Sequence, residues 1–252
     1  MRIWIDLANS PHVPLFRALA PELRARGHET IFTARDFAQT AEMARAAGLA
    51  FEVVGARGST RALARKAGGI AGRALALARW ARGRGVDLAV SHNSYAQVLA
   101  ARALGIRSVT LMDYEHQPAN HLAFRLASRV VVPAAFPDAD LRRAGARASK
   151  VRRYDGIKED VYLADFVPDP AFAAELRGEF GLTDEDILVV ARPPARDALY
   201  HRFDNALFDE LLEDLARRPR VKLFLLARGD AQRASYEARF MGVSNIVIPR
   251  RA

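Results

Sequence analysis

The sequence contains no cysteine, which excludes a disulfide framework and a thiolate metal site. It also has no apolar run that approaches the roughly 20 residues a membrane helix needs. The first residues lead directly into an apolar, strand-like segment that includes Asp6. They lack the basic, apolar and small-residue sections of a signal peptide. These absences are typical of a cytoplasmic protein, and we expect that location and no transmembrane segment.

Lysine is scarce, and the formal net charge of +9 therefore comes from arginine. A charge of this sign is compatible with a polyanionic partner such as nucleic acid. The arginines, however, are spread over the expected helix faces. Their densest stretch, residues 57–84, offers only Trp80 as an aromatic ring on which a base could stack. We therefore do not expect a nucleic-acid partner.

Several binding motifs are also missing. No Gly-x-Gly-x-x-Gly or P-loop sequence occurs, so NAD binding and NTP hydrolysis lose support. No Gly-x-Ser-x-Gly elbow supports a serine hydrolase. The histidines are scattered, and His116 and His121 are one residue further apart than the spacing that places two ligands on one helix face. The sequence predicts neither a metal site nor a cofactor.

What the sequence does contain is a regular alternation of β-prone apolar runs and helical patterns. The expected strands of the first part are residues 3–7, 29–33, 51–54, 86–90, 108–112 and 129–133, with a further candidate at 150–154. The expected helices are residues 13–26, 37–47, 60–82, 95–104 and 119–127. Such alternation predicts repeated βαβ units, and therefore an α/β fold with a parallel sheet covered by helices on both faces.

The alternation breaks between residues 148 and 170, where segments 155–159 and 166–170 have the composition of a linker. It then resumes, with expected strands at 187–191, 221–226 and 245–248 and expected helices at 171–180, 203–217 and 231–240. The prediction is two Rossmann-like parallel-sheet domains, residues 1–155 and 170–252. Three strands are fewer than the four to six of most sheets, so we expect the second domain to be incomplete and the chain to be truncated at its C-terminus.

Polar side chains gather where the expected strands end, most densely at residues 113–121. In an open parallel sheet, ligands bind beyond the carboxyl ends of the strands. We therefore expect an active site at this edge. The polar residues of the three loops that would line it are Asn9, Ser10, His12, His92, Ser94, Asp113, Glu115, His116, Asn120 and His121.

Each of these candidates also has a purely structural interpretation. His92 is suited to general base catalysis because imidazole titrates near neutral pH, or it is simply hydrogen-bonded into the domain edge. Asn9, Ser10 and His12 either hold substrate oxygens, or Ser10 caps the helix that follows. The loop at residues 55–59 is either part of an acceptor site or an ordinary glycine-containing connection.

Several stretches resemble the DUF354 family within the GT-B glycosyltransferase superfamily. They are residues 4–12, 33–36, 91–97, 112–116 with 120–121, 192–194 and 200–205. The resemblance covers almost the whole chain. It implies relatives that are glycosyltransferases or UDP-N-acetylglucosamine 2-epimerase-like enzymes, which hold a nucleotide sugar in a cleft between two Rossmann-like halves. It also implies a further stretch carrying the main diphosphate site, so we expect this chain to bind nucleotide weakly or not at all.

The resemblance also implies roles for individual residues. The 2-epimerases use a carboxylate at a comparable strand end for proton transfer, which favours Glu115, with Asp113 beside it. The alternative for Glu115 is an ion pair with Arg125 or His121. His201 and Arg202 resemble the start of the His-Arg-x-Glu-Asn element of the 2-epimerases, although Asp204 replaces the glutamate.

Arg192 either pairs with a phosphate, for which a guanidinium group is well shaped, or forms a structural salt bridge. The prediction for the whole chain is a nucleotide-sugar-dependent glycosyltransferase or epimerase with a sugar or lipid acceptor, impaired by truncation. The alternative is a non-catalytic glycan or nucleotide-sugar binding protein on the same scaffold. Self-association into a homo-oligomer is left open.

Overall fold

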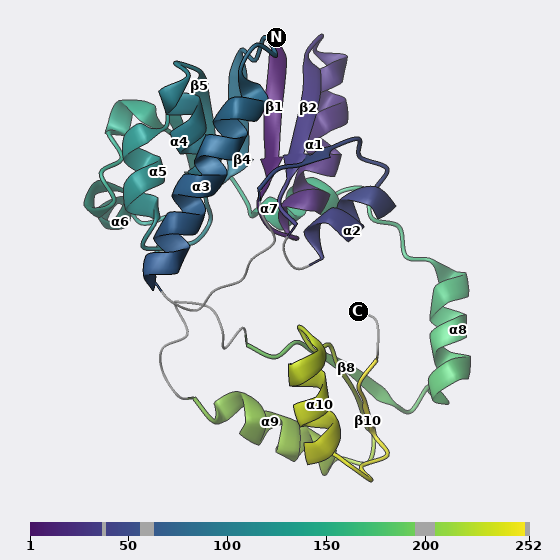
Figure 1. Ribbon diagram of the computed structural model, residues 1–252. Coiled ribbons are helices and arrows are strands. Elements are labelled where there is room, and N and C mark those ends of the chain that lie inside the picture. The colour runs from purple at the N-terminus through teal and green to yellow at the C-terminus, as the bar shows by residue number, and fades with distance from the viewer. Residues whose placement is uncertain (37–38, 56–62, 195–204, 250–252) are drawn as a thin grey trace. The chain divides into compact units, whose positions relative to one another are not determined.

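The structure, a computed structural model, describes residues 1–36, 39–55, 63–194 and 205–249. The chain forms two compact units, Met1–Phe166 and Val167–Ala252 (Figure 1). Each unit contains a parallel sheet, which confirms the predicted α/β fold. The start of the helix expected at 37–47, most of the loop at 55–59 and the starts of the helices expected at 60–82 and 203–217 lie outside the described residues. No helix in the described ranges is long and apolar enough to cross a membrane.

The sheet of the first unit has seven parallel strands in the order β3-β2-β1-β4-β5-β6-β7. Their bounds are β1 (Arg2–Leu7), β2 (Glu29–Ala34), β3 (Glu52–Val53), β4 (Leu88–His92), β5 (Arg107–Leu111), β6 (Arg129–Pro133) and β7 (Val151–Tyr154). The chain adds β2 and β3 on one side of β1 and then returns to add β4 on the other side. This reversal of strand order between β1 and β4 creates a topological switch point, where the chain continues from the two neighbouring strands to helices on opposite faces of the sheet.

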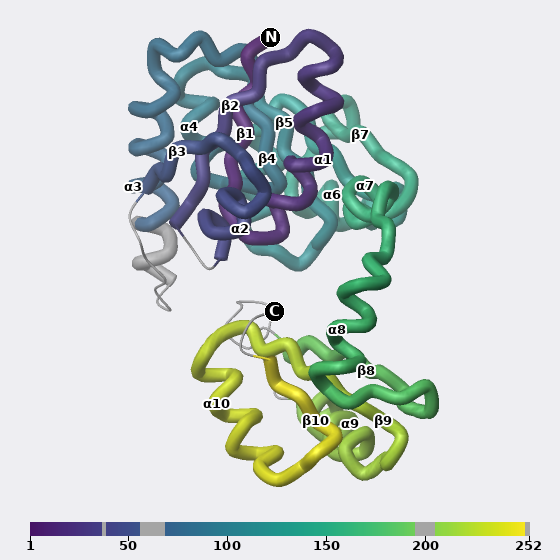
Figure 2. Tube along the Cα trace, turned by 90° about the vertical axis from the view of Figure 1, so that its right-hand side faces the viewer, coloured from purple at the N-terminus to yellow at the C-terminus, as the bar shows by residue number. Residues whose placement is uncertain are grey.

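Helices cover both faces of this sheet (Figure 2). One face carries α1 (His12–Ala25), α2 (Thr40–Ala46) and α7 (Lys158–Leu163), and the other carries α3 (Leu63–Ala81), α4 (Tyr95–Ala103) and α5 (Asn120–Leu126). Successive side chains of a strand point to opposite faces. In β1, therefore, Ile3 and Ile5 pack in the cluster with α1, whereas Trp4 packs in the cluster with α3 and α4.

Two helices of the first unit were not predicted. The first, α6 (Asp138–Arg143), packs Leu141 into the core beside α5, and a short 3₁₀ helix (Ala148–Lys150) follows it. The second is α7, which occupies part of the segment that the sequence analysis assigned to a linker. It begins there because Gly156 turns the chain with φ +90° and Asp160 Oδ2 accepts a hydrogen bond from the Ile157 amide at 2.8 Å.

The second unit has a smaller parallel sheet with the strand order β10-β9-β8. Its strands are β8 (Ile187–Ala191), β9 (Val221–Leu225) and β10 (Ile246–Val247), and its helices are α8 (Pro170–Phe180), α9 (Leu207–Ala216) and α10 (Asp230–Arg239). The core consists of side chains from β9, α9 and α10, including Leu212, Leu223, Leu225 and Tyr236. All three predicted strands are therefore present.

Candidate functional site

The predicted polar loops meet at the switch point of the first sheet. β1 and β4 are hydrogen-bonded neighbours, so the loop that carries Asn9, Ser10 and His12 lies beside the loop that carries His92 and Ser94. The ring centroids of His12 and His92 are 5.2 Å apart. β5 is the next strand in the sheet and delivers Asp113 to the same edge. Parallel strand order thus gathers side chains that are far apart in the sequence.

His92, Asp113 and Lys158 form the most closely connected group at this edge. His92 Nε2 lies 3.3 Å from Asp113 Oδ1, and the ammonium group of Lys158 contacts Asp113 Oδ2. Lys158 Nζ also lies 3.0 Å from Glu159 Oε1. The side chain of His92 is 11% exposed and that of Asp113 is 22% exposed. Both remain accessible to a small ligand while most of their surface is removed from water.

The charges of this group stabilise one another. Partial burial raises the pKa of Asp113, but the hydrogen bonds and charges of His92 and Lys158 outweigh it, and the pKa lies well below its usual range. Burial lowers the pKa of Lys158, but its interactions with Asp113 and Glu159 raise it above the ordinary value. Asp113 is therefore a carboxylate and Lys158 an ammonium ion at neutral pH.

His12 is held in the neutral form. Burial, followed by the charge of His92, lowers the pKa of His12 to about 3. The backbone N–H of Ala8 donates to His12 Nδ1 at 3.2 Å. The hydrogen bond assigns the proton of the neutral ring to Nε2. His12 thus offers a hydrogen-bond donor beside His92 without adding a second positive charge.

A buried ion pair lies beneath the site, on the α3 and α4 face of the sheet. Arg73 in α3 donates to both oxygens of Asp6 in β1, at 2.8 and 2.7 Å. Thr33 and Ser94 each donate a further hydrogen bond to this carboxylate. Burial raises the pKa of Asp6, but Arg73 and these hydrogen bonds outweigh it and lower the pKa. The carboxylate thereby ties β1, β2, α3 and α4 together under the candidate loops.

Two asparagines fix the loop that follows β5. Asn93 adopts a left-handed conformation with φ +55°, which asparagine tolerates better than most residues. Its side-chain amide donates to Asn120 Oδ1 at 2.7 Å, and the Asn120 amide donates to the Tyr114 carbonyl at 3.0 Å. Asn120 is buried. These bonds hold residues 113–121 against the loop after β4.

Glu115, His116 and His121 line a cavity of about 160 Å³. Glu115 Oε1 lies 3.6 Å from His116 Nε2, whereas Arg125 donates to the His121 carbonyl at 2.7 Å. The proposed ion pair of Glu115 with Arg125 or His121 is therefore wrong, and the structure gives Glu115 a different partner. This cavity is lined by a set of residues that does not include His92 or Asp113.

The structure of the loop after β1 contradicts one of the two interpretations of Ser10. Pro11 occupies the N-cap position of α1, and no side chain caps this helix. Ser10 Oγ instead lies 3.4 Å from Thr40 Oγ1, and Asn9 Oδ1 accepts a hydrogen bond from the Ser10 amide. The interpretation of Ser10 as a helix cap is therefore wrong. Substrate binding by Asn9 and Ser10 stays a prediction.

The remaining predicted residues belong to the second unit. Arg192 follows β8 and is exposed, and it forms no ion pair with any residue that the structure describes. The structural salt bridge considered for Arg192 is thus not seen within those ranges. His201 and Arg202 lie outside the described residues. A phosphate-binding role for Arg192 stays a prediction.

Sequence reasoning missed four residues that shape the site: Asp6, Arg73, Asn93 and Lys158. Lys158 was hidden because its segment has the composition of a linker, although two acidic residues in a row, Glu159 and Asp160, are typical of the first turn of a helix. Arg73 was counted among the solvated arginines of a basic helix, yet only 8% of its side chain is exposed. Within the described ranges, no group of three acidic or histidine side chains is arranged to hold a metal ion.

Comparison with known proteins places the chain among proteins of related architecture. A family model described as "Protein of unknown function (DUF354)" matches residues 1–252. The Methanocaldococcus jannaschii protein described as "Uncharacterized protein MJ0665" is 24% identical over 253 residues, which span 98% of this chain and 70% of that protein.

Solved structures extend this likeness. The structure of S. aureus MnaA with UDP has a TM-score of 0.74 and 11% identity, and the match covers all of this chain and 68% of that one. The UDP-GlcNAc 2-epimerase from Neisseria meningitidis, bound to UDP-GlcNAc, has a TM-score of 0.65 and 12% identity. That match covers all of this chain and 73% of that one. Anabaena HepE in complex with UDP-glucose has a TM-score of 0.65 and 16% identity, and the match covers 98% of this chain and 68% of that one. The predicted GT-B-like fold is thereby confirmed.

Proposed function

Because the chain belongs to the DUF354 family and has a GT-B-like fold, we propose that it is an enzyme acting on a nucleotide sugar. It either transfers the sugar to an acceptor or epimerises it. The observation that carries this proposal is the group formed by His92, Asp113 and Lys158 at the switch point of the sheet. Similar folds solved with UDP or a UDP-sugar support the choice of ligand, although fold likeness alone does not define an activity.

In this proposal His92 moves the proton. The carboxylate of Asp113 accepts a hydrogen bond from His92 Nε2–H, which leaves the lone pair of Nδ1 available to the substrate. A carboxylate on one ring nitrogen also stabilises the imidazolium that forms when the other nitrogen takes a proton. During transfer the proton comes from an acceptor hydroxyl, whose oxygen bonds to the sugar as the bond from the sugar to the nucleotide breaks. During epimerisation it comes from the inverting carbon, which then regains a proton on its opposite face.

Lys158 and His12 position this base. The Lys158 ammonium keeps Asp113 ionised and aimed at His92. His12 stays neutral and presents Nε2–H as a donor for a sugar or phosphate oxygen. The neutral ring adds no positive charge beside His92, whose ring centroid lies 5.2 Å away.

Glu115 is the second candidate for the proton-transferring group. Its carboxylate is partly exposed and lines the cavity with His116 and His121, so a ligand has access to it. Ser94 and Asn120 are engaged in internal hydrogen bonds, and in this proposal they shape the loops that contact the substrate. Charge on the departing nucleotide needs cationic or donor groups, for which Arg192, His201 and Arg202 stay the predicted residues.

The proposal is tested by measuring turnover of a panel of labelled nucleotide sugars, with and without sugar and lipid acceptors. We expect turnover by the wild type and a loss of about 10²–10⁴-fold in kcat for His92→Gln if His92 is the general base. Glu115→Gln measures the second candidate in the same assay. His28→Gln is the matched control, because His28 lies outside the candidate loops. Absence of both turnover and nucleotide-induced thermal stabilisation would refute the proposal.

Saturable binding of a nucleotide sugar or glycan without product would instead favour the non-catalytic alternative. A sugar or lipid acceptor and a cytoplasmic location stay predictions, and self-association stays open.

A further inference from the structure

A second cavity, of about 860 Å³, lies in the first unit away from the candidate site. We call it the basic cavity because half of its lining residues are cationic. These are Arg102, Arg107, Arg125, Arg129, Arg147 and Lys150. The other lining residues are Gly105, Ile106, Leu126, Ala127, Ser128 and Gly145. No acidic residue lines it within the described ranges.

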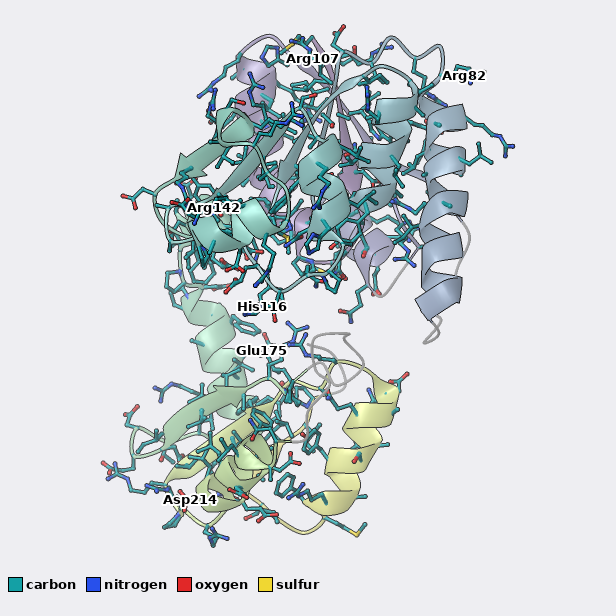
Figure 3. All side chains as sticks on the ribbon, turned by 90° about the vertical axis from the view of Figure 1, so that its left-hand side faces the viewer. Arg82, Arg107, His116, Arg142, Glu175 and Asp214 are labelled. Carbon is teal, nitrogen blue, oxygen red and sulfur yellow. The ribbon has the colours of Figure 1, made fainter. Side chains whose placement is uncertain are left out.

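The basic cavity sits at the amino edge of the sheet. Arg107 begins β5 and Arg129 begins β6, whereas the candidate loops follow the carboxyl ends of the strands. Figure 3 shows Arg107 and His116 at opposite ends of the first unit. The cavity is therefore not an extension of the candidate site.

Only some of the cationic side chains of the basic cavity are explained by a stabilising position at the end of a helix. Lys150 Nζ donates to the carbonyls of Arg125 and Ala127 at 2.9 Å each, at the end of α5. Arg102 lies in the last turn of α4, where a cation is favoured by the helix dipole. Arg107, Arg129 and Arg147 have no such position. None of these three forms an ion pair with a residue that the structure describes, so their charges are not neutralised within those ranges.

The cationic groups are close enough to oppose one another. Burial lowers the pKa of Lys150, and the charges of Arg147, Arg102 and Arg129 lower it further. Like charges that approach this closely destabilise the folded state unless an anion occupies the space between them. A concave site with several fixed cations and no competing carboxylate is suited to a multiply charged anion.

The lining also indicates the kind of anion. It contains no aromatic side chain, whereas proteins that bind single-stranded nucleic acid use aromatic rings to stack the bases. Its volume falls within the range of small-ligand sites. We propose that the basic cavity binds the phosphate groups of a ligand that carries at least two phosphates. Such groups occur in free oligophosphates and in lipid headgroups, and the two sources share the same recognition chemistry.

The test compares two charge-reversal variants of the full chain. Arg107→Glu with Arg147→Glu changes two exposed lining residues, and Arg17→Glu with Arg82→Glu changes the net charge equally on α1 and beyond α3. Neither control arginine lines the cavity or forms an ion pair with a described residue. Thermal unfolding establishes that both variants remain folded. Inorganic tripolyphosphate is the soluble probe, titrated by calorimetry. Vesicles of phosphatidylcholine, with and without a diphosphorylated lipid, form the membrane arm.

We expect the wild type to bind tripolyphosphate, or vesicles with the diphosphorylated lipid only, and the cavity variant to bind at least about ten-fold more weakly. The affinity of the control variant for the same probe should fall by less than about two-fold. Binding to the soluble probe identifies a free ligand, and binding confined to vesicles identifies a headgroup. Equal losses in both variants, or no binding to either probe, would overturn the proposal. Tighter binding of an oligonucleotide than of tripolyphosphate at one salt concentration would also overturn it, in favour of a nucleic-acid site.

Discussion

Asp113 lies with one carboxylate oxygen 3.3 Å from His92 Nε2, and its other oxygen contacts the Lys158 ammonium group. The arrangement joins the ends of β4 and β5 to the first turn of α7. Its value for chemistry lies in holding an ionised carboxylate against an accessible imidazole.

The first prediction concerns Asp113. Asp113→Asn keeps the shape of the side chain but removes the negative charge that orients and stabilises His92 in its protonated form. We expect kcat to fall by at least about 10²-fold with little change in ligand affinity. Turnover and equilibrium binding of the same nucleotide sugar measure the two quantities. An equal loss of both would assign Asp113 a structural role instead.

The second prediction concerns Lys158 and pH. Lys158→Met removes an interaction that lowers the pKa of Asp113, so that pKa should rise toward its ordinary value of about 4. In the wild type, the ionised carboxylate contributes stability above that ordinary value, and this stability is lost as the pH falls through the lower pKa of the folded state. The variant should lose activity and stability at a higher pH than the wild type. Lys222→Met, in β9 of the second unit, is the control. If Lys158→Met lost activity and stability at the same low pH as the wild type, that result would argue against the ion pair of Lys158 with Asp113.

The third prediction concerns the buried ion pair. Arg73→Met leaves the Asp6 carboxylate buried without its guanidinium partner, and breaking such a pair costs about 3–5 kcal/mol. Both tryptophans, Trp4 and Trp80, belong to the first unit, so the urea midpoint from tryptophan fluorescence reports on that unit alone. Glu29→Gln, which breaks the exposed pair with Arg2, should leave the midpoint almost unchanged. Similar shifts in both variants would contradict this view.

The fourth prediction concerns His12. Because its pKa is lowered to about 3, its ring should not titrate between pH 8 and pH 5, and NMR of the imidazole protons follows this directly. The unfolded chain takes up a proton near pH 6.5, so stability falls below that pH and is lost further as the pH approaches the pKa of the folded state. His12→Gln should weaken this dependence. An inflection of the His12 signal near pH 6.5 in the folded protein would disprove the neutral assignment.

The fifth prediction compares two glycines with positive φ. Gly27→Ala should cost about 1–2 kcal/mol through backbone strain alone, since nothing surrounds the added Cβ. At Gly156 the added Cβ would also collide with the Asp160 carboxylate that accepts from Ile157. Gly156→Ala should therefore destabilise the first unit more and displace Lys158. Thermal unfolding and turnover of both variants measure the difference. Equal effects of the two substitutions would show that the contact with Asp160 does not contribute to the stability of the first unit.

Much of the first unit follows from local patterns. Short runs such as 3–7 and 108–112 are apolar and β-prone, and glycines end the helices between them, so periodicity alone predicts the parallel sheet. Because such a sheet places all strand ends at one edge, it also brings His12, His92 and Asp113 together.

The missed residues depend on contacts between distant segments. Asp6 and Arg73 are 8% exposed or less because they satisfy each other, and a charge pattern cannot distinguish such a pair from solvated residues. Lys158 matters only because α7 packs against the α1 face, and the linker-like composition around it gave no sign of this. Helix α6 was missed since its six residues are too few to establish a period.

The position of Lys158 has a consequence for the order in which the protein acquires function. During synthesis His12 emerges first, followed by His92, Asp113 and finally Lys158, near the end of the first unit. The sheet strands that place the first three residues precede Lys158 in the chain, and domains fold as units while the N-terminal part is synthesised first. A nascent chain that stops before α7 has its imidazoles and carboxylate but lacks the cation that balances them, so chemical competence arrives with the last segment of the unit.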